Sequence, residues 1–177
     1  MRDGSVVMLA LGALVVTGCS RFNQPEAVAP IQSVRAALSD VSGRRVGEAT
    51  LQQLPKGVLI VADLSSLPSG THAMHLHETG RCVPPFESAG LHFNPLGTQH
   101  GFRNPAGPHA GDLPNIHVTV GGTLRVEHFV EGMRLTGEGG LLADDGSAIV
   151  IHQFADDYSS DPAGASGDRI ACGVLMR

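Results

Sequence analysis

Histidines whose spacing could form a metal site are the first feature of this sequence. The stretch HAMHLHETGRC, residues 72–82, places three histidines within six residues. In an extended strand, residues i and i+2 point to the same face, so His75 and His77 can face outward together while Met74 and Leu76 enter a core. Two imidazoles side by side on a strand can bind a transition metal. His72 lies on the opposite face, so we place it outside the site.

A second histidine-rich stretch supplies a full set of ligands for one metal ion. Residues 91–112, LHFNPLGTQHGFRNPAGPHAGD, contain His92, His100, His109 and Asp112. Their spacings of eight, nine and three match neither a helix nor a strand, so no packing face explains them. Three imidazoles and one carboxylate form a tetrahedral set that suits Zn²⁺. The alternative is an ordinary polar surface loop, although such loops are rarely so rich in histidine.

The elements that must position these side chains are short strands. The 177 residues fit one domain, and 23 glycines and 11 prolines interrupt the chain often. Apolar or alternating segments predict strands at 57–64, 116–120, 124–130, 146–152 and 170–175. His152 ends one of these segments and could supply a third imidazole from the same sheet surface. Two irregular stretches, about 78–113 and 153–169, are long enough to be functional loops. We therefore predict an all-β sandwich or barrel that carries two functional loops.

The N-terminal residues have the pattern of an export signal. Residues 6–16, VVMLALGALVV, form an 11-residue apolar run, which is too short to span a bilayer and suits a signal-peptide core. The following VTGC, ending at Cys19, resembles a bacterial lipobox, in which the cysteine is acylated. The alternative is an ordinary signal peptide with an incidental cysteine. We predict a lipoprotein signal peptide at 1–18, a flexible tether at 19–32 and one folded domain at 33–177.

Export also determines how the other two cysteines are interpreted. Outside the cytoplasm, Cys82 and Cys172 are expected to form a disulfide. Two free thiols remain an alternative, and a thiolate metal pair is less favoured because no local Cys-x-x-Cys is present. The net charge of −5 and the absence of a basic stripe argue against a nucleic-acid partner.

Five short segments, in order along the chain, resemble those of copper-zinc superoxide dismutases. They are MHLHE, LHFNP, HAGD, IHQFADD and GDRIACGV, and the resemblance covers about residues 33–176. Two further segments, GPHAGDLPN and DDYSSDPAG, are similar to the bacterial branch of the family. The resemblance implies a Greek-key β-barrel or sandwich of about eight antiparallel strands, with a metal loop and an electrostatic loop.

The resemblance also implies a role for each matching residue. The implied copper ligands are His75, His77, His92 and His152, and the implied zinc ligands are His92, His100, His109 and Asp112, with one copper and one zinc per chain. Asp156 matches the carboxylate that links a copper histidine to a zinc histidine, and Arg169 matches the arginine beside copper. Cys82 and Cys172 match the family disulfide.

The implied activity is the dismutation of superoxide to O₂ and H₂O₂. In the family, copper changes oxidation state, zinc is structural, and the bridging histidine, here His92, releases copper and carries a proton to the product. With the export signal, this predicts a lipid-anchored enzyme of the cell envelope that meets superoxide outside the cytoplasm and contacts the membrane only through its lipid. A homodimer is compatible with the sequence, which has no diagnostic patch. The alternative is a copper carrier or buffer on the same fold, which a missing copper ligand or arginine would favour; neither is missing.

One segment departs from the family pattern. Residues 156–168 contain four aspartates and no lysine or arginine, whereas relatives usually carry lysines around the channel mouth. Attraction of superoxide would then depend on the metals and Arg169, or on Arg81 and Arg103, so we predict weaker steering than in a lysine-rich relative. We expect no metal role for His117, which should face solvent, or for His128, which should be a hydrogen-bonded core or edge residue.

Overall fold

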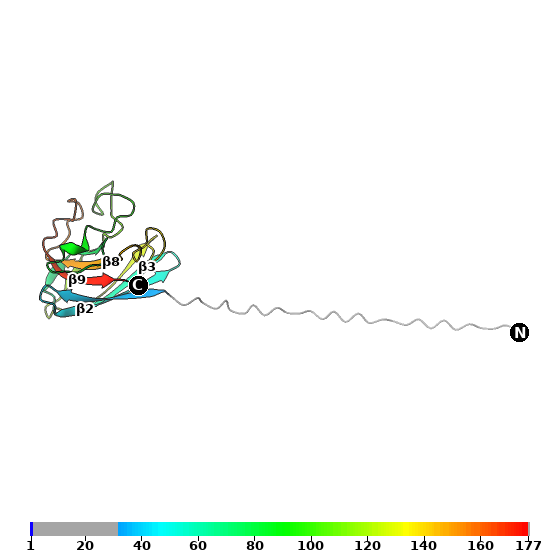
Figure 1. Cartoon of the computed structure of the whole chain (residues 1–177), viewed down its shortest axis with the longest axis horizontal. Helices are drawn as coiled ribbons and strands as arrows, with labels where there is room; N and C mark the ends of the chain where they lie inside the picture. Colours follow the sequence, from blue (N-terminus) through cyan, green and yellow to red (C-terminus); the bar gives the residue numbers. More distant parts are fainter. Residues whose placement is uncertain (2–31, 177) are drawn as a thin grey trace.

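The computed structural model describes Met1 and residues 32–176, and its regular structure is almost entirely β (Figure 1). Within these residues there are nine strands and one 3₁₀ turn, η1, at Glu87–Ala89. The strands are β1 (Ser33–Asp40), β2 (Arg45–Leu54), β3 (Gly57–Leu64), β4 (Gly70–His72), β5 (Met74–His77), β6 (Ile116–Val118), β7 (Leu124–Glu131), β8 (Ser147–His152) and β9 (Arg169–Leu175). Only Ala73 separates β4 from β5, so the two continue one another. The prediction of an all-β fold with about eight strands is confirmed.

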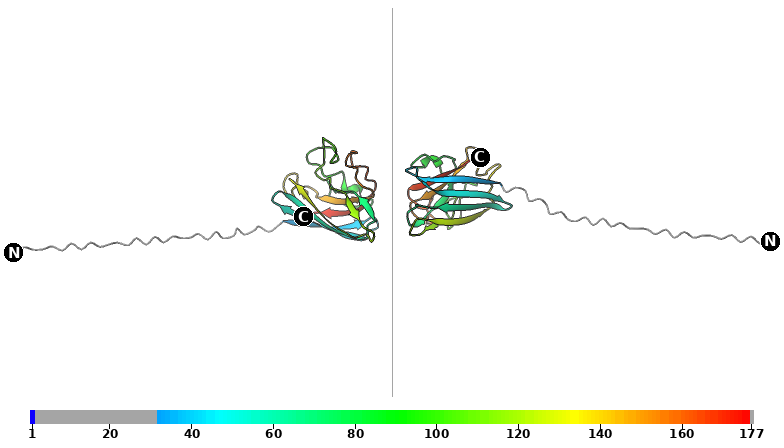
Figure 2. Two further views of the ribbon diagram at one scale, coloured as in Figure 1. Left: turned by 180° about the vertical axis from the view of Figure 1, so that it is seen from behind. Right: turned by 90° about the horizontal axis from the view of Figure 1, so that it is seen from below.

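The strands form a curled antiparallel sheet whose order differs from the order along the chain (Figure 2). Seven strands are hydrogen-bonded in the order β5-β8-β9-β1-β2-β3-β7, and β4 pairs with β6 in a separate two-stranded sheet. After β3 the chain therefore crosses to β5 at the opposite edge, as a Greek-key connection requires. This crossing places β5 beside β8, with His75 opposite Val150 in the register.

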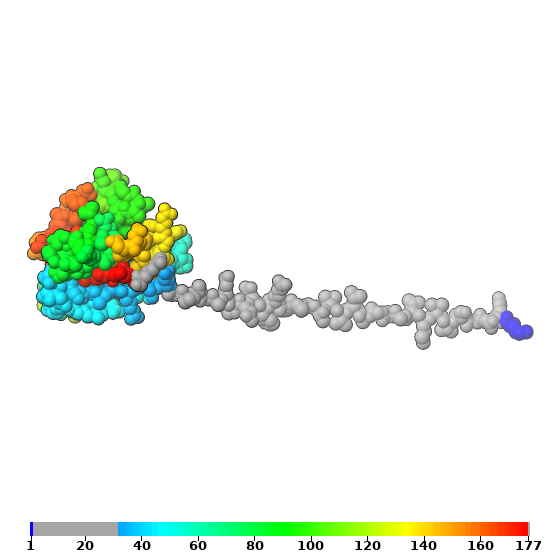
Figure 3. Space-filling view, in the orientation of Figure 1, coloured from blue at the N-terminus to red at the C-terminus, as the bar shows by residue number. Residues whose placement is uncertain are grey.

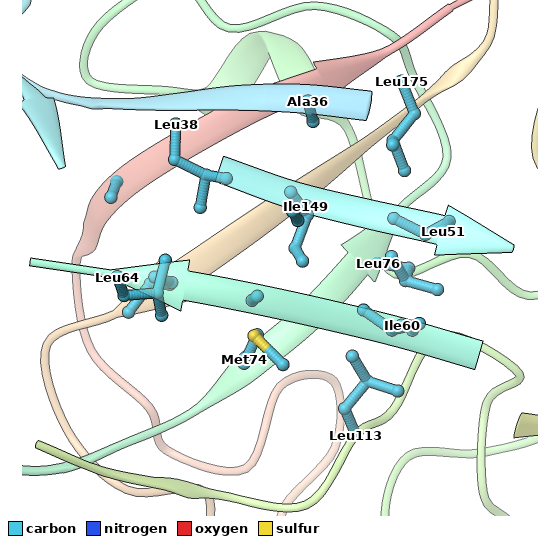
Figure 4. Close-up of a cluster of buried hydrophobic side chains, with 14 of the residues drawn as sticks. Ala36, Leu38, Leu51, Ile60, Leu64, Met74, Leu76, Leu113, Ile149 and Leu175 are labelled. Carbon is cyan, nitrogen blue, oxygen red and sulfur yellow. The ribbon is translucent and has the colours of Figure 1, made fainter. Parts of the chain in front are cut away.

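The core lies inside the curl of the sheet and follows the alternation of the strands. In β1, for example, Val34, Ala36 and Leu38 are buried while the residues between them are exposed. Apolar side chains from β1, β2, β3, β5, β8 and β9 converge there (Figure 4). A second, smaller cluster of Phe86, Ala89, Ala148, Val150 and Cys172 packs on the other face of β8 and β9. That outer face is therefore covered by other parts of the chain rather than by water.

Two long connections provide this cover. One runs from the end of β5 to β6 and contains only η1, and the other runs from the end of β8 to β9. They project from the same side of the sheet and lie together in the space-filling view (Figure 3). The backbone N–H of His100 donates to Asp161 Oδ1 over 2.8 Å, and the N–H of Arg103 donates to the carbonyl of Tyr158 over 2.9 Å. The two predicted functional loops thus form one layer over β5 and β8.

A disulfide joins this layer to the sheet. Cys82, in the first loop, is bonded to Cys172 on β9, and their Cα atoms are 5.7 Å apart. The predicted disulfide is confirmed, and the two alternatives for these cysteines are excluded. Among the described residues, no helix is long and apolar enough to cross a membrane. Apart from Met1, the predicted signal peptide lies outside the described residues, as does the predicted tether apart from residue 32.

Candidate metal centre

His75 and His77 leave β5 on the face that the two loops cover. Met74 and Leu76 point into the main core, as the alternation predicts (Figure 4). The imidazoles do point to the other face, but they do not reach solvent, since both residues have 0% exposed surface. The side chains point away from the main core, as expected, but they are not exposed to solvent because loop residues cover them.

His92 reaches the same place because its segment pairs with β5. The N–H of Phe93 donates to the carbonyl of Leu76 over 2.8 Å, and the N–H of Glu78 donates to that of Leu91 over 2.9 Å. These bonds place His77 and His92 opposite each other in an antiparallel bridge. The first loop therefore begins by folding back along the strand that carries the first two histidines.

A first group of four imidazoles results when β8 adds His152. The backbone N–H of His152 donates to the carbonyl of Ala73 over 2.9 Å, which keeps the end of β8 beside the start of β5. One nitrogen from each ring lies within 4.8 Å of the others, in the group His75, His77, His92 and His152. All four residues are buried.

A second group of ligand-type atoms surrounds the other side of His92. It consists of His92, His100, His109 and Asp112, all buried. The Nδ1 atoms of the three histidines lie 2.8, 3.1 and 3.3 Å from Asp112 Oδ1. Four atoms held tetrahedrally at about 2.0 Å from a zinc ion would be roughly 3.3 Å apart, so the spacing fits that geometry.

The hydrogen-bond pattern of the first group also fits a metal ion. Among the described residues, four buried imidazole nitrogens of this group have no hydrogen-bond partner: His75 Nδ1, His77 Nε2, His92 Nε2 and His152 Nε2. A buried polar atom without a partner is costly, and ligation of a cation removes that cost. The second nitrogen of His77 donates to the carbonyl of Gly90 over 3.0 Å, which leaves Nε2 as a lone-pair donor.

Asp156, from the second loop, links the two groups. Its Oδ2 accepts a hydrogen bond from His75 Nε2 over 2.9 Å, and its Oδ1 accepts one from His100 Nε2 over 3.0 Å. The side-chain amide of Asn115 brackets the Asp156 backbone, accepting from its N–H over 2.8 Å and donating to its carbonyl over 2.9 Å. One carboxylate thus orients one histidine of each group.

Burial and hydrogen bonds together determine the pKa values of these side chains. Burial lowers the pKa of His77 to about 2, of His152 to about 3 and of His92 to about 4, helped by repulsion between neighbouring imidazoles. Burial alone would raise the pKa of Asp156, but the hydrogen bonds from His75 and His100 outweigh it and lower the pKa to about 2. The pKa of Asp112 is lowered in the same way, against burial, by His92 and the N–H of Gly101. Neutral imidazoles and ionised carboxylates are the protonation states that metal binding requires.

Comparison with known proteins identifies the family. Residues 45–175 match the Copper/zinc superoxide dismutase (SODC) family. The chain belongs to the copper/zinc superoxide dismutase family. The metals of this family are copper and zinc, its members are oxidoreductases, and their substrate is superoxide.

Individual relatives agree with this assignment. A copper-zinc superoxide dismutase of Aquifex aeolicus is 47% identical over 145 residues, covering 79% of this chain and 85% of the relative. One from Caulobacter vibrioides is 37% identical over 173 residues, covering 95% and 99%. A crystal structure of a double mutant of a SOD-like protein from Bacillus subtilis has a TM-score of 0.78 and 41% identity, covering 81% of this chain and 97% of that one.

Arg169, which the resemblance matches to the arginine beside copper, lies at the start of β9. Its two terminal nitrogens donate to the carbonyls of Phe86 and Gly90, each over 2.7 Å. Burial lowers its pKa from the usual value, although an arginine remains charged at neutral pH. Arg169 and His92 line one cavity of about 380 Å³. The same Gly90 carbonyl accepts from His77, so Arg169 and a histidine of the first group share an acceptor.

The charged residues that line this cavity bear on the predicted weak steering of superoxide. Besides Arg169, they are Glu78 and Asp161, so the fixed charges sum to −1. Glu78 is exposed, and its Oε1 accepts a hydrogen bond from the N–H of Leu91 over 3.1 Å. No lysine lines this cavity, and Arg81 and Arg103 are not among its lining residues either. The cavity lining thus lacks lysine, in agreement with the absence of lysine and arginine from residues 156–168.

Three histidines, His72, His117 and His128, lie outside both groups, as predicted. His117 is exposed on β6, as expected. His72 belongs to neither group, as predicted; it is buried, and its ring lies 2.9 Å from the carbonyl of His152 and 3.0 Å from that of Pro68. His128 was expected to be hydrogen-bonded, yet its buried Nε2 has no partner among the described residues. Periodicity along the sequence cannot reveal such contacts, because they depend on how distant loops return to the sheet.

Proposed function

We propose that this chain dismutates superoxide with one copper and one zinc per chain. Copper would be held by His75, His77, His92 and His152, and zinc by His92, His100, His109 and Asp112. The observation that carries the proposal is that two four-residue groups share a single residue, His92, whose Nδ1 faces one group and whose Nε2 faces the other. Two independent metal sites would not need a common ligand.

The reaction consumes two superoxide ions and two protons and yields one O₂ and one H₂O₂. Copper, when bound, supplies the one-electron redox chemistry, and zinc, which has none, supplies fixed positive charge. The side chains of the chain must therefore bind an anion in a fixed place and provide a proton there.

Arg169 is suited to binding the anion. Its side chain is oriented by the carbonyls of Phe86 and Gly90, and a guanidinium has five N–H donors, so others remain for a ligand. The charge does not titrate near neutral pH, so binding would not depend on pH in that range.

His92 is suited to carrying the proton. Its Nε2 belongs to the first group, and the residue lines the same cavity as Arg169. The buried Nε2 has no hydrogen-bond partner among the described residues, so it is free to take up a proton and pass it to the product. His92 Nδ1 lies 2.8 Å from Asp112 Oδ1, so the second group would hold the ring on this side while Nε2 gains and loses the proton.

The proposed location of the enzyme is the cell envelope. Support comes from the apolar run at residues 6–16 and from the lipobox-like VTGC. Cleavage after residue 18 would leave Cys19 as a lipidated first residue, with 19–32 as the tether of the domain at 33–177. The Cys82–Cys172 disulfide agrees with an oxidising compartment. The enzyme would act on superoxide outside the cytoplasm and touch the membrane through the lipid alone.

The test measures metal content and superoxide consumption on one purified sample. We expect one copper and one zinc per chain and rapid turnover. His152→Ala should remove copper and activity while retaining zinc, whereas the exposed His117→Ala should change neither. Full metal loading without turnover would overturn the proposal in favour of a copper carrier, and copper retention by His152→Ala would overturn the ligand assignment. The lipid is tested separately, by the mass of the mature N-terminus and its loss in Cys19→Ser.

A further inference from the structure

His152 differs from the other histidines of the first group in what holds its ring. The second ring nitrogen of His75 faces the Asp156 carboxylate, and that of His77 faces the Gly90 carbonyl. Both partners can only accept a hydrogen bond. The Nδ1 of His152 instead lies 3.0 Å from a hydroxyl, Ser166 Oγ, and 3.3 Å from the carbonyl of Gly167.

Of these two contacts, the hydroxyl is the better placed. N–H···O bonds in proteins have donor–acceptor distances of about 2.7–3.2 Å, so 3.0 Å is within the usual range while 3.3 Å is beyond it. Ser166 is 2% exposed, so water does not compete for the contact. We infer that Ser166 is a positioning residue for copper binding, whose hydroxyl accepts the Nδ1–H of His152 and keeps Nε2 as the ligand atom.

The direction of the bond follows from the role proposed for His152, on which this inference rests. A neutral imidazole that ligates through Nε2 must carry its proton on Nδ1. The Ser166 oxygen then accepts, and this fixes the tautomer and the ring orientation. Such outer hydrogen bonds also raise the basicity of a ligand nitrogen.

The path of the second loop explains why Ser166 can reach the ring. After its excursion the loop returns alongside the residues that follow β8. The N–H of Phe154 donates to the carbonyl of Ser166 over 2.9 Å, and the N–H of Gln153 donates to that of Asp168 over 2.7 Å. Between them, Gly167 has φ of +73°, and a Cβ there would come within 2.6 Å of the Phe154 ring. A glycine at 167 thus permits the close return that brings the hydroxyl to His152.

Two substitutions test the hydroxyl directly in the full chain. Ser166→Ala removes it from a buried position, and Ser159→Ala, in the same loop but exposed, is the matched control. We expect Ser166→Ala to weaken Cu²⁺ binding by about tenfold, the lower end of the range for such partners, because Gly167 remains near the ring. Zinc affinity should be unchanged in both variants, and Ser166→Thr, which retains a hydroxyl, should restore copper affinity.

A second measurement reports on the ring without copper or turnover. In the zinc-loaded, copper-free protein, the ¹⁵N shifts of His152 show which nitrogen carries the proton. We expect the Nδ1–H form alone in the unmodified protein and a mixture of tautomers in Ser166→Ala. Equal copper affinity and equal ¹⁵N shifts in these two proteins would overturn the inference. His152→Ala separates the two proposals: if it does not weaken copper binding, the ligand assignment fails, and if it does while Ser166→Ala has no effect, only the role of Ser166 fails.

Discussion

Alanine at position 164 would place a methyl group against the carboxylate that links the two ligand groups. Gly164 has φ of +67°, and a Cβ built there overlaps with Asp156 Oδ1 and lies 2.8 Å from His100 Nε2. Gly97 is the matched control in the first loop, since its φ is +64° and nothing lies within 4 Å of an added Cβ. The two variants share the cost of a left-handed backbone and differ in the overlap.

The difference in stability can be worked out from the contacts that must break. A left-handed non-glycine residue costs about 1–2 kcal/mol, which applies to both variants. In Gly164→Ala the Asp156 carboxylate must also move, and its Oδ1 accepts from His100 Nε2 over 3.0 Å and from the N–H of Tyr158 over 2.7 Å. Hydrogen bonds to a charged group contribute about 1.5–3 kcal/mol each, so losing one or both costs at least about 1.5 kcal/mol more than the control.

The assay is urea denaturation of the zinc-loaded protein, with zinc affinity measured by chelator competition. We expect Gly97→Ala to lose about 1–2 kcal/mol of unfolding free energy and to retain its zinc affinity. Gly164→Ala should lose at least about 2.5 kcal/mol in total and release zinc more easily, because His100 loses its partner. If the two variants differ by less than about 0.5 kcal/mol, Asp156 does not hold the groups together as described.

Three further predictions concern charge, the disulfide and pH. Glu78→Gln keeps an oxygen for the N–H of Leu91 but removes one negative charge from the cavity. The repulsion between that charge and superoxide at about 10 Å in water is about 0.4 kcal/mol. We therefore expect kcat/KM to rise about twofold at low salt and the gain to vanish at high salt. A steep fall of the unmodified enzyme's rate with salt would contradict weak steering. The double variant Cys82→Ser, Cys172→Ser opens a link across 90 residues of sequence and should cost about 4–5 kcal/mol in urea denaturation, as should chemical reduction of the unmodified chain; an unchanged midpoint would contradict this. Burial lowers the pKa of His92 to about 4 and of His152 to about 3. Below pH 6.5 the unfolded chain therefore binds more protons than the folded chain, so folding becomes less stable as the pH falls. We expect the urea concentration at the unfolding midpoint of the metal-free protein to decrease as the pH is lowered from 6.5 to 4. A midpoint that is flat over this range would show that these rings are not buried as neutral groups.

The strands predicted from the sequence match β3, β5, β6, β7, β8 and β9, but no strand range was predicted over β1, β2 or β4. The residues that meet in the two groups are those implied by the resemblance to the family. Alternation in MHLH correctly predicts which side chains enter the core, because a strand fixes side-chain direction locally. It does not predict that His75 and His77 are fully buried, because the loops that cover them have no regular spacing of apolar residues. The contacts of His72, Asn115 and Ser166 depend on where those loops return, and the unpaired Nε2 of His128 depends on what packs above an edge strand.

The carbonyl of Gly90 couples the motions of His77 and Arg169, because both side chains donate a hydrogen bond to it. It accepts from His77 Nδ1 over 3.0 Å and from Arg169 over 2.7 Å, so one peptide unit holds both a histidine of the first group and the guanidinium proposed to bind the anion. When thermal motion displaces this peptide, both side chains are pulled in the same direction. The separation between these two side chains should therefore fluctuate less than the position of either one.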